Sequence, residues 1–257
     1  MHYIVSLSGG AASAVAGERV IDRYGADAVT LWIADTRWED DDLWRFVGDC
    51  CRRWGKEIIC HTDGRTPLQV FEGRQIIPNS LIAPCSEELK IKPFRAFLLA
   101  QPKPVTVLLG LDWTEQHRHD APRRNYEAID GVTVDYPLMW EPIEFRPYVD
   151  VVRSWGIAPP RAYALGFPHN NCGGRCVRQG QREWNRLRAT HPDRFAEVRD
   201  GEQEHRAQGG ARAERSILKA RAGGDAAPLT LLELEQRNEP SDERPYTEDM
   251  FGCFCTY

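Results

Sequence analysis

Short apolar runs alternate with amphipathic segments over the first 140 residues of the chain. The run from Tyr3 to Leu7 ends at Ser8-Gly9-Gly10, and the segment that follows has apolar residues at helical spacing. A second run, at 28–34, is unbroken, as in buried parallel strands. We predict strands at 3–7, 28–34, 56–60 and 104–111 and helices at 11–24 and 40–54. This alternation predicts an α/β fold with a doubly wound, mostly parallel, Rossmann-like sheet.

The pattern changes beyond Pro137, where prolines separate short helical segments. We predict helices at 148–155, 183–189 and 231–237, and a capping box of Thr230 and Glu233 opens the last one. The segment 208–227 is rich in Gly, Ala and Arg, which indicates a flexible connector or a short helix between loops. The chain therefore divides into an α/β domain of residues 1–140 and a helical or irregular, cysteine-bearing region of residues 141–257.

The composition is that of a globular protein, because 42% of the 257 residues are apolar and 28% are charged. The uncharged stretch from Tyr3 to Gly17 is only 15 residues long and no Lys or Arg precedes it. We therefore expect no membrane span, no secretory signal and a cytoplasmic location. The net charge of −5 argues against a general polyanion binder, although 161–223 carries 12 Arg and 1 Lys against 7 acidic residues. That stretch is compatible with a nucleic-acid partner or with a solvated helix surface.

The glycine turn after the first predicted strand is a candidate phosphate site. Gly9 and Gly10 lack side chains that would keep an anion at a distance, and the amides at the start of the next helix converge there. Ser8 and Ser13 add hydroxyl donors. A plain tight turn of an α/β fold is the alternative. The turn matches neither the Gly-Lys-Ser/Thr P-loop nor the Gly-x-Gly-x-x-Gly dinucleotide fingerprint.

An ordered series of segments resembles one family. Ser8-Gly9-Gly10-x-x-Ser13 is similar to the pyrophosphate loop (PP-loop), Ser-Gly-Gly-x-Asp-Ser, of the adenine nucleotide α-hydrolase superfamily, which includes ATP pyrophosphatases and phosphoadenosine phosphosulfate (PAPS) reductases. Further segments resemble other elements of that family: Asp35-Thr36 with Glu39, Pro84 to Pro93, Gly110 to Arg118, and Tyr136-Pro137-Leu138. Residues 166–172 look like a stretch of its phage and prophage members.

The resemblance implies a PP-loop nucleotide-binding domain over residues 1–140 and a role for particular side chains. The implied ligands of ATP or another adenine nucleotide, with Mg²⁺, are Ser8, Gly9, Gly10, Ser13, Asp35, Thr36, Gly110 and Glu115. The implied catalytic residues are Lys90, Arg118 and Cys85, and the cations of this region, with Lys92, Arg123 and Arg124, would neutralise charge on the phosphates. Two positions depart from the family pattern, since Ala12 replaces the usual Asp of the loop and Asp112 the usual Arg of reductases.

Two close cysteine pairs, Cys172 with Cys176 and Cys253 with Cys255, can bind one centre if the tail folds back. Four thiolates hold a [4Fe-4S] cluster or a Zn²⁺ ion, whereas a redox dithiol or unrelated thiols are the alternatives. We expect Arg175 and His169 to offset the charge of the thiolates.

Cys85 is a further candidate, because the resemblance places it next to the nucleotide. It could replace one tail cysteine as a ligand or act as a thiolate or persulfide nucleophile. We predict that Cys50, Cys51 and Cys60 are small buried apolar side chains.

These features together predict a PAPS reductase-like ATP pyrophosphatase. The enzyme would convert ATP to AMP and pyrophosphate and so activate an acceptor, such as a nucleobase or nucleic acid, for sulfur transfer or a related modification. A sulfur or electron donor protein is an expected partner. The alternatives are reduction of PAPS or its analogue with Cys255 or Cys253 as the nucleophile, and a non-catalytic nucleotide sensor or nucleic-acid-binding module.

Overall fold

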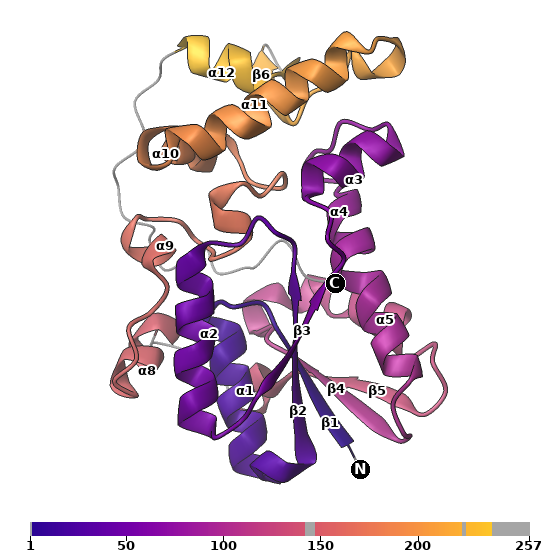
Figure 1. Cartoon of the computed structure of the whole chain (residues 1–257), viewed down its shortest axis with the longest axis vertical. Coiled ribbons are helices and arrows are strands. Elements are labelled where there is room, and N and C mark those ends of the chain that lie inside the picture. The colour runs from indigo at the N-terminus through magenta and orange to yellow at the C-terminus, as the bar shows by residue number, and fades with distance from the viewer. Residues whose placement is uncertain (1, 142–146, 223–224, 238–257) are drawn as a thin grey trace.

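A five-stranded parallel sheet forms the centre of the computed structural model, which describes residues 2–141, 147–222 and 225–237 (Figure 1). The strands are β1 (His2–Leu7), β2 (Val29–Asp35), β3 (Ile58–Thr62), β4 (Val105–Leu109) and β5 (Val132–Asp135), in the spatial order β3-β2-β1-β4-β5. The predicted fold class is confirmed, and each predicted strand is present. The chain leaves β1 in one direction to form β2 and β3 and later returns to its other side as β4. The topological switch point therefore lies between β1 and β4, where ligands of doubly wound sheets usually bind.

Helices cover both faces of the sheet. Successive residues of each strand point to opposite faces, so both sets of side chains pack against helices. Val5 points to one face and packs with α1 (Ala11–Tyr24), α2 (Asp41–Trp54) and α8 (Tyr148–Ser154). Ile4 points to the other face and packs with α5 (Lys92–Leu99) and α6 (Asp120–Tyr126). β1 is thus buried on both sides, which explains its nearly continuous apolar sequence.

Short helical segments connect these elements. They are η1 (Ala26–Ala28), α3 (Pro67–Arg74), α4 (Pro84–Ser86), the π-helical turn η2 (Glu87–Ile91), η3 (Trp113–Arg118), α7 (Pro137–Trp140), α9 (Arg161–Ala164), η4 (Cys172–Gly174) and η5 (Gly210–Arg212). The residues that matter for the site lie on α4, η2, α9 and η4.

The last part of the described chain forms a second packed unit. It consists of α10 (Gln181–Thr190), α11 (Pro192–Ala207), an antiparallel pair of strands, β6 (Leu218–Ala222) and β7 (Asp225–Leu229), and α12 (Leu231–Arg237). In Figure 1 these helices lie together at the top, with α3 beside them. The expectation of a flexible connector or a short helix over residues 208–227 is wrong for 218–222 and 225–227, which form strands, whereas η5 is a short helix within that segment. The carboxylate of Glu202 accepts hydrogen bonds from the amides of Ile217 and Leu231 (2.7 and 2.6 Å), which fixes the open end of the strand pair to α11.

The hydrophobic core of this second unit includes residues from the first half of the chain. Trp38, Phe71 and Ile77 pack with Trp184, Phe195 and their neighbours. α8, which lies beyond residue 140, packs against α1 instead. Contacts thus cross residue 140 in both directions, and the boundary there stays a prediction. Among the helices in the described ranges, none is long and apolar enough to cross a membrane.

Candidate functional site

The loop after β1 has the hydrogen bonding of a preformed turn. The Ser13 hydroxyl accepts hydrogen bonds from the Ser8 amide (3.2 Å) and the Ser8 hydroxyl (3.1 Å) and donates to the Gly10 carbonyl (2.9 Å). Gly9 has a φ of +76°, and a Cβ atom there would lie 2.5 Å from the Leu43 side chain. Ser8, Gly9, Gly10 and Ser13, all predicted nucleotide ligands, are therefore brought together at the carboxyl end of β1.

Gly110 brings the end of β4 against the same loop. A Cβ atom at Gly110 would lie 2.7 Å from the Cα atom of Ser13, so only glycine permits this approach. The loops after β1 and β4 consequently meet at the topological switch point, which is where the sheet order places a ligand site. The predicted grouping of Gly110 with the PP-loop residues agrees with this geometry.

Two side chains from the C-terminal half form hydrogen bonds with the backbone of this loop. The sequence analysis gave neither of them a role there. The Tyr163 hydroxyl on α9 accepts a hydrogen bond from the Ala11 amide (3.1 Å). The Asn170 side-chain amide donates to the Gly9 carbonyl (2.9 Å), and Asn170 is buried. One amide at the start of α1 is therefore bonded to a tyrosine in this structure, and the carbonyl of Gly9 is bonded to an asparagine.

A small hollow, partly open to solvent, lies beside Ser8, and we call it the aromatic hollow. Its lining residues come from β1, β2, η2, α5 and α6: Ser6, Leu7, Ser8, Trp32, Ala34, Lys90, Ile91, Phe94 and Tyr126. The rings of Trp32, Phe94 and Tyr126 belong to the core and are almost fully buried beneath it.

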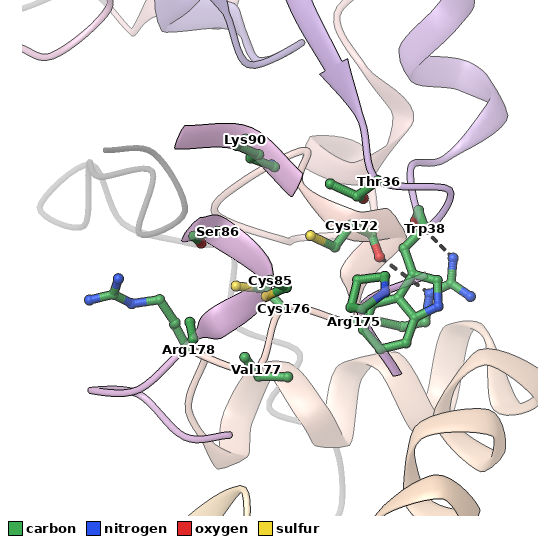
Figure 2. A pocket seen from close by; sticks show the side chains of 12 residues that line it. Thr36, Trp38, Cys85, Ser86, Lys90, Cys172, Arg175, Cys176, Val177 and Arg178 are labelled. Carbon is green, nitrogen blue, oxygen red and sulfur yellow. Dashed lines mark hydrogen bonds between the residues drawn. The ribbon is translucent and has the colours of Figure 1, made fainter. Parts of the chain in front are cut away.

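Three cysteines face a second small hollow, which we call the thiol pocket (Figure 2). Cys85 comes from α4, whereas Cys172 and Cys176 come from η4 and the residues after it. The other lining residues are Thr36, Trp38, Pro67, Ala83, Ser86, Lys90, Arg175, Val177 and Arg178. Figure 2 shows the three sulfur atoms on the same side of the pocket, below Lys90. The structure thus brings Cys85 together with the first predicted cysteine pair.

The thiol of Cys85 is a poor nucleophile in this environment. Burial and, to a smaller extent, the nearby Cys172 sulfur raise its pKa to about 12 in spite of Lys90, which lowers it. Cys85 is therefore protonated near neutral pH unless a metal binds it, because a metal ion stabilises the thiolate form. This favours a ligand role for Cys85 over an unassisted nucleophile.

The described residues contain no group of three His, Cys, Asp or Glu side chains that could hold a single metal ion. In a tetrahedral zinc site the sulfur atoms lie about 3.8 Å apart, as follows from a Zn–S distance of about 2.3 Å. A four-iron cluster binds each thiolate at a different iron atom, so its ligands are more widely spaced. Cys85, Cys172 and Cys176 share one pocket, and a cluster bound by them stays a prediction. Cys253 and Cys255, the other two predicted ligands, lie outside the described residues.

Arg175 and His169 do not supply the positive charge that we expected near the thiols. The Arg175 guanidinium forms an ion pair with Glu197, donates to the Trp38 carbonyl (2.8 Å) and stacks on the Trp38 ring. Burial, with a further contribution from Arg118, lowers the pKa of His169 to about 4, so His169 is neutral near pH 7. Arg175 instead holds the loop around Cys172, because it donates to the carbonyls of Cys172 and Trp38.

Lys90 contributes to the walls of both hollows. Its ammonium nitrogen lies 3.8 Å from Oε1 of Glu39, whose side chain is only 3% exposed. Lys92, in contrast, points to the surface and pairs with Glu88 (2.7 Å). Of the two predicted lysines, therefore, Lys90 is the one placed to contact a ligand.

The segment from Gly110 to Arg118 is held by buried polar contacts. Asp112 accepts hydrogen bonds from the Thr114 amide (2.9 Å), the Thr114 hydroxyl (2.6 Å) and the Tyr148 hydroxyl (2.9 Å). Asp112 thus caps η3, which explains an acid where the resemblance leads one to expect arginine. Arg118 forms an ion pair with Glu115, and burial raises the pKa of Glu115 to about 7 in spite of that arginine.

The end of β2 connects to the thiol pocket. Asp35 accepts a hydrogen bond from the Arg37 amide (2.7 Å), and Thr36 donates to Glu39 (2.9 Å). Thr36 lines the thiol pocket and not the aromatic hollow, so its predicted role as a nucleotide ligand has no support in the contacts seen.

The remaining cysteines lie apart from the site. Cys50 is buried in the core between α1 and α2, as predicted, and Cys51 is partly buried. The prediction for Cys60 is wrong, because Cys60 is exposed. It lies on β3, which is an edge strand of the sheet with little cover on its outer residues.

Four arginines of the basic stretch, Arg175 among them, form ion pairs with neighbouring acids. Arg161 and Arg194 both pair with Asp40 (2.7 Å each), and Arg199 pairs with Glu235 (2.8 Å). These contacts favour a structural use of the arginines over a surface for nucleic acid.

Comparisons of the chain with models of protein families and with curated protein sequences found no match.

Proposed function

We propose that the chain is a PP-loop enzyme that binds ATP and uses it to activate an acceptor, with a cysteine-bound iron–sulfur cluster beside the nucleotide. The observation that carries this proposal is that Lys90 lines both the aromatic hollow next to Ser8 and the thiol pocket. A ligand in one hollow and a reactive group in the other would therefore meet at one cation.

The loop and the aromatic hollow suit the two ends of an adenine nucleotide. Trp32, Phe94 and Tyr126 are almost fully buried, so a planar base would lie over the apolar floor that they form and would have to widen the hollow. Ser8 and Ser13, with the amides that begin α1, offer donors to phosphate oxygens. The Tyr163 hydroxyl, which bonds to the Ala11 amide, would have to exchange that contact for a phosphate oxygen or donate to one itself.

In the proposed reaction an acceptor oxygen, for example that of a nucleobase, attacks the α-phosphorus of ATP. The bond between the α-phosphorus and the bridging oxygen breaks, pyrophosphate leaves, and the acceptor carries AMP. A sulfur nucleophile from a donor protein then displaces AMP. Lys90 stabilises the negative charge that develops on the phosphoryl oxygens, and the Ser8–Ser13 loop holds the departing pyrophosphate.

The cluster of this proposal would be bound by the cysteines of the thiol pocket. Cys85, Cys172 and Cys176 would hold three of its irons, and a tail cysteine, Cys253 or Cys255, would supply a fourth ligand. When bound, such a cluster supplies iron that can bind sulfur, and it can transfer single electrons. The chain's own contribution is to bury the thiolates and to place Lys90 over them.

The test uses the full chain purified without oxygen. We expect ATP with Mg²⁺ to bind in calorimetry and Ser13→Ala to weaken binding at least about tenfold, because three hydrogen bonds of the loop pass through that hydroxyl. Ser154→Ala is the matched control, since the Ser154 hydroxyl bonds only to a carbonyl within α8. Absence of ATP binding would overturn the proposal.

Products separate the proposal from its rivals. Pyrophosphate released from ATP in the presence of nucleobase or nucleic-acid acceptors supports it. Sulfite released from PAPS would instead identify a sulfonucleotide reductase. Tight ATP binding with no product in either reaction would identify a nucleotide sensor.

A further inference from the structure

We propose that Glu39 is a positioning residue that holds Lys90 between the two hollows and makes its placement depend on the cysteine loop. This inference rests on the proposed function, to which it adds a residue that neither hollow includes among its walls. Glu39 is nearly inaccessible to solvent, and such a carboxylate is stable only where partners satisfy it.

Each oxygen of Glu39 has its own partners. Oε1 accepts a hydrogen bond from the Thr36 hydroxyl (2.9 Å) and lies 3.8 Å from the ammonium nitrogen of Lys90. Oε2 accepts a hydrogen bond from the backbone amide of Cys172 (2.7 Å). One carboxylate thus connects the end of β2, the lysine of η2 and the first cysteine of the C-terminal half.

The backbone on both sides of these contacts is rigid. The next residue, Asp40, caps α2 and is held by Arg161 and Arg194. Cys172 has a φ of +53°, an uncommon value for a residue with a side chain, which its surroundings must maintain. A shift of the cysteine loop would therefore move the Cys172 amide relative to Glu39, and Glu39 in turn limits where Lys90 can go.

The charge of Glu39 has two opposite effects on a nucleotide. It neutralises part of the Lys90 charge, which weakens attraction of phosphate in the ground state. It also restricts a flexible side chain to one place, which favours the transition state. Loss of the charge alone should therefore strengthen ATP binding and lower turnover, a combination that a merely structural carboxylate would not give.

The experiment compares Glu39→Gln and Glu39→Asp with the wild type and with Glu88→Gln as the control. Glu88 also forms an ion pair with a lysine of the same helical segment, but at the surface. A brief acetic anhydride pulse measures the reactivity of Lys90, iodoacetamide measures that of Cys172, and peptide mass spectrometry reads both. ATP affinity and turnover are measured in parallel.

We expect Glu39→Gln to raise labelling of Lys90 and of Cys172 about fivefold each, since loss of one partly buried charge contact is worth about that factor. We also expect it to tighten ATP binding about threefold or more while turnover falls at least about tenfold. For Glu39→Asp, we expect labelling, ATP affinity and turnover between those of Glu39→Gln and of the wild type. Glu88→Gln should change none of these values. If Glu39→Gln does not fold, the same measurements of labelling, ATP affinity and turnover on Glu39→Asp test the inference.

Unchanged labelling of Lys90 and Cys172 in a folded Glu39 variant would overturn the inference even if ATP binds. Increased labelling in a chain that binds no ATP would leave the coupling through Glu39 intact and overturn only the proposed function.

Discussion

The side-chain amide of Asn170 lies 2.9 Å from the carbonyl oxygen of Gly9, a residue 161 positions earlier in the chain, and donates a hydrogen bond to it. Two residues after Asn170, the amide of Cys172 bonds to Glu39. A single short segment therefore contacts both the loop after β1 and Glu39, and its Cys172 lines the thiol pocket. The candidate site needs residues from both halves of the chain.

Replacement of Asn170 should weaken this connection. We expect Asn170→Ala to lower the free energy of unfolding by about 1 to 3 kcal/mol, because a carbonyl loses its buried partner. ATP affinity should fall about tenfold as the Gly9 peptide loses its fixed orientation. Urea unfolding and calorimetry give both values. A variant with normal ATP affinity would mean that the loop keeps its shape without Asn170.

Substitution of Gly110 tests the close approach of β4 and α1. In Gly110→Ala the new methyl group would lie 2.7 Å from the Ser13 Cα atom, so the backbone must move. We expect a loss of about 1 to 3 kcal/mol in the free energy of unfolding and at least about tenfold weaker ATP binding. Gly73→Ala is the control, since a Cβ atom there meets nothing within 4 Å and the residue lies in α3. That variant should be as stable as the wild type or slightly more stable.

Iron content distinguishes two possible sets of cluster ligands. One set contains Cys85 and a single tail cysteine, and the other contains both Cys253 and Cys255 without Cys85. After anaerobic reconstitution with iron and sulfide, we expect Cys85→Ser, Cys172→Ser and Cys176→Ser each to lose most of the bound iron and its visible absorption. Cys60→Ser is the control, because that thiol is exposed and lies on β3. Full iron content in Cys85→Ser, together with loss in both Cys253→Ser and Cys255→Ser, would support the four cysteines chosen from spacing. Zinc in place of iron in the purified chain would contradict the cluster.

His169 should make stability depend on pH in mildly acidic solution. Burial, together with Arg118, lowers its pKa to about 4 in the folded chain, against about 6.5 in the unfolded chain. The unfolded chain therefore binds the proton more readily, so the stabilisation is present above pH 6.5 and is lost as the pH falls toward 4. Between pH 7.5 and pH 5 we expect the wild type to lose about 2 kcal/mol more than His169→Gln. Equal losses in urea unfolding of the two proteins would show that His169 carries no such linkage.

Much of the fold was predictable because its strands are strongly apolar. β1 and β4 are buried on both faces, so their sequences are nearly continuous runs of large apolar residues. β5 was missed, since Val132–Asp135 is only four residues long and alternates with polar positions. α11 was also missed, because two of its four buried residues, Glu202 and His205, are polar and leave no clear apolar stripe.

The candidate site was predictable only where it is local in sequence. Ser8 to Ser13 form one turn, and Cys172 with Cys176 form one loop, so motif spacing was sufficient to group them. The approach of Cys85 to Cys172 joins residues far apart in the chain and depends on how α4 packs against η4, which spacing does not report. Tyr163 gave no signal at all, since a lone tyrosine in a short helix resembles any surface aromatic residue.

The core of the second unit contains residues from both halves of the chain, which has a consequence for synthesis of the protein on the ribosome. Trp38, Phe71 and Ile77 emerge early, yet the side chains that cover them, as far as Leu234, are made last. Until synthesis is nearly complete these three residues have no native cover and are exposed to solvent, which is a state that chaperones bind and that favours aggregation. A premature stop after the parallel sheet would leave the nascent chain with that surface permanently uncovered.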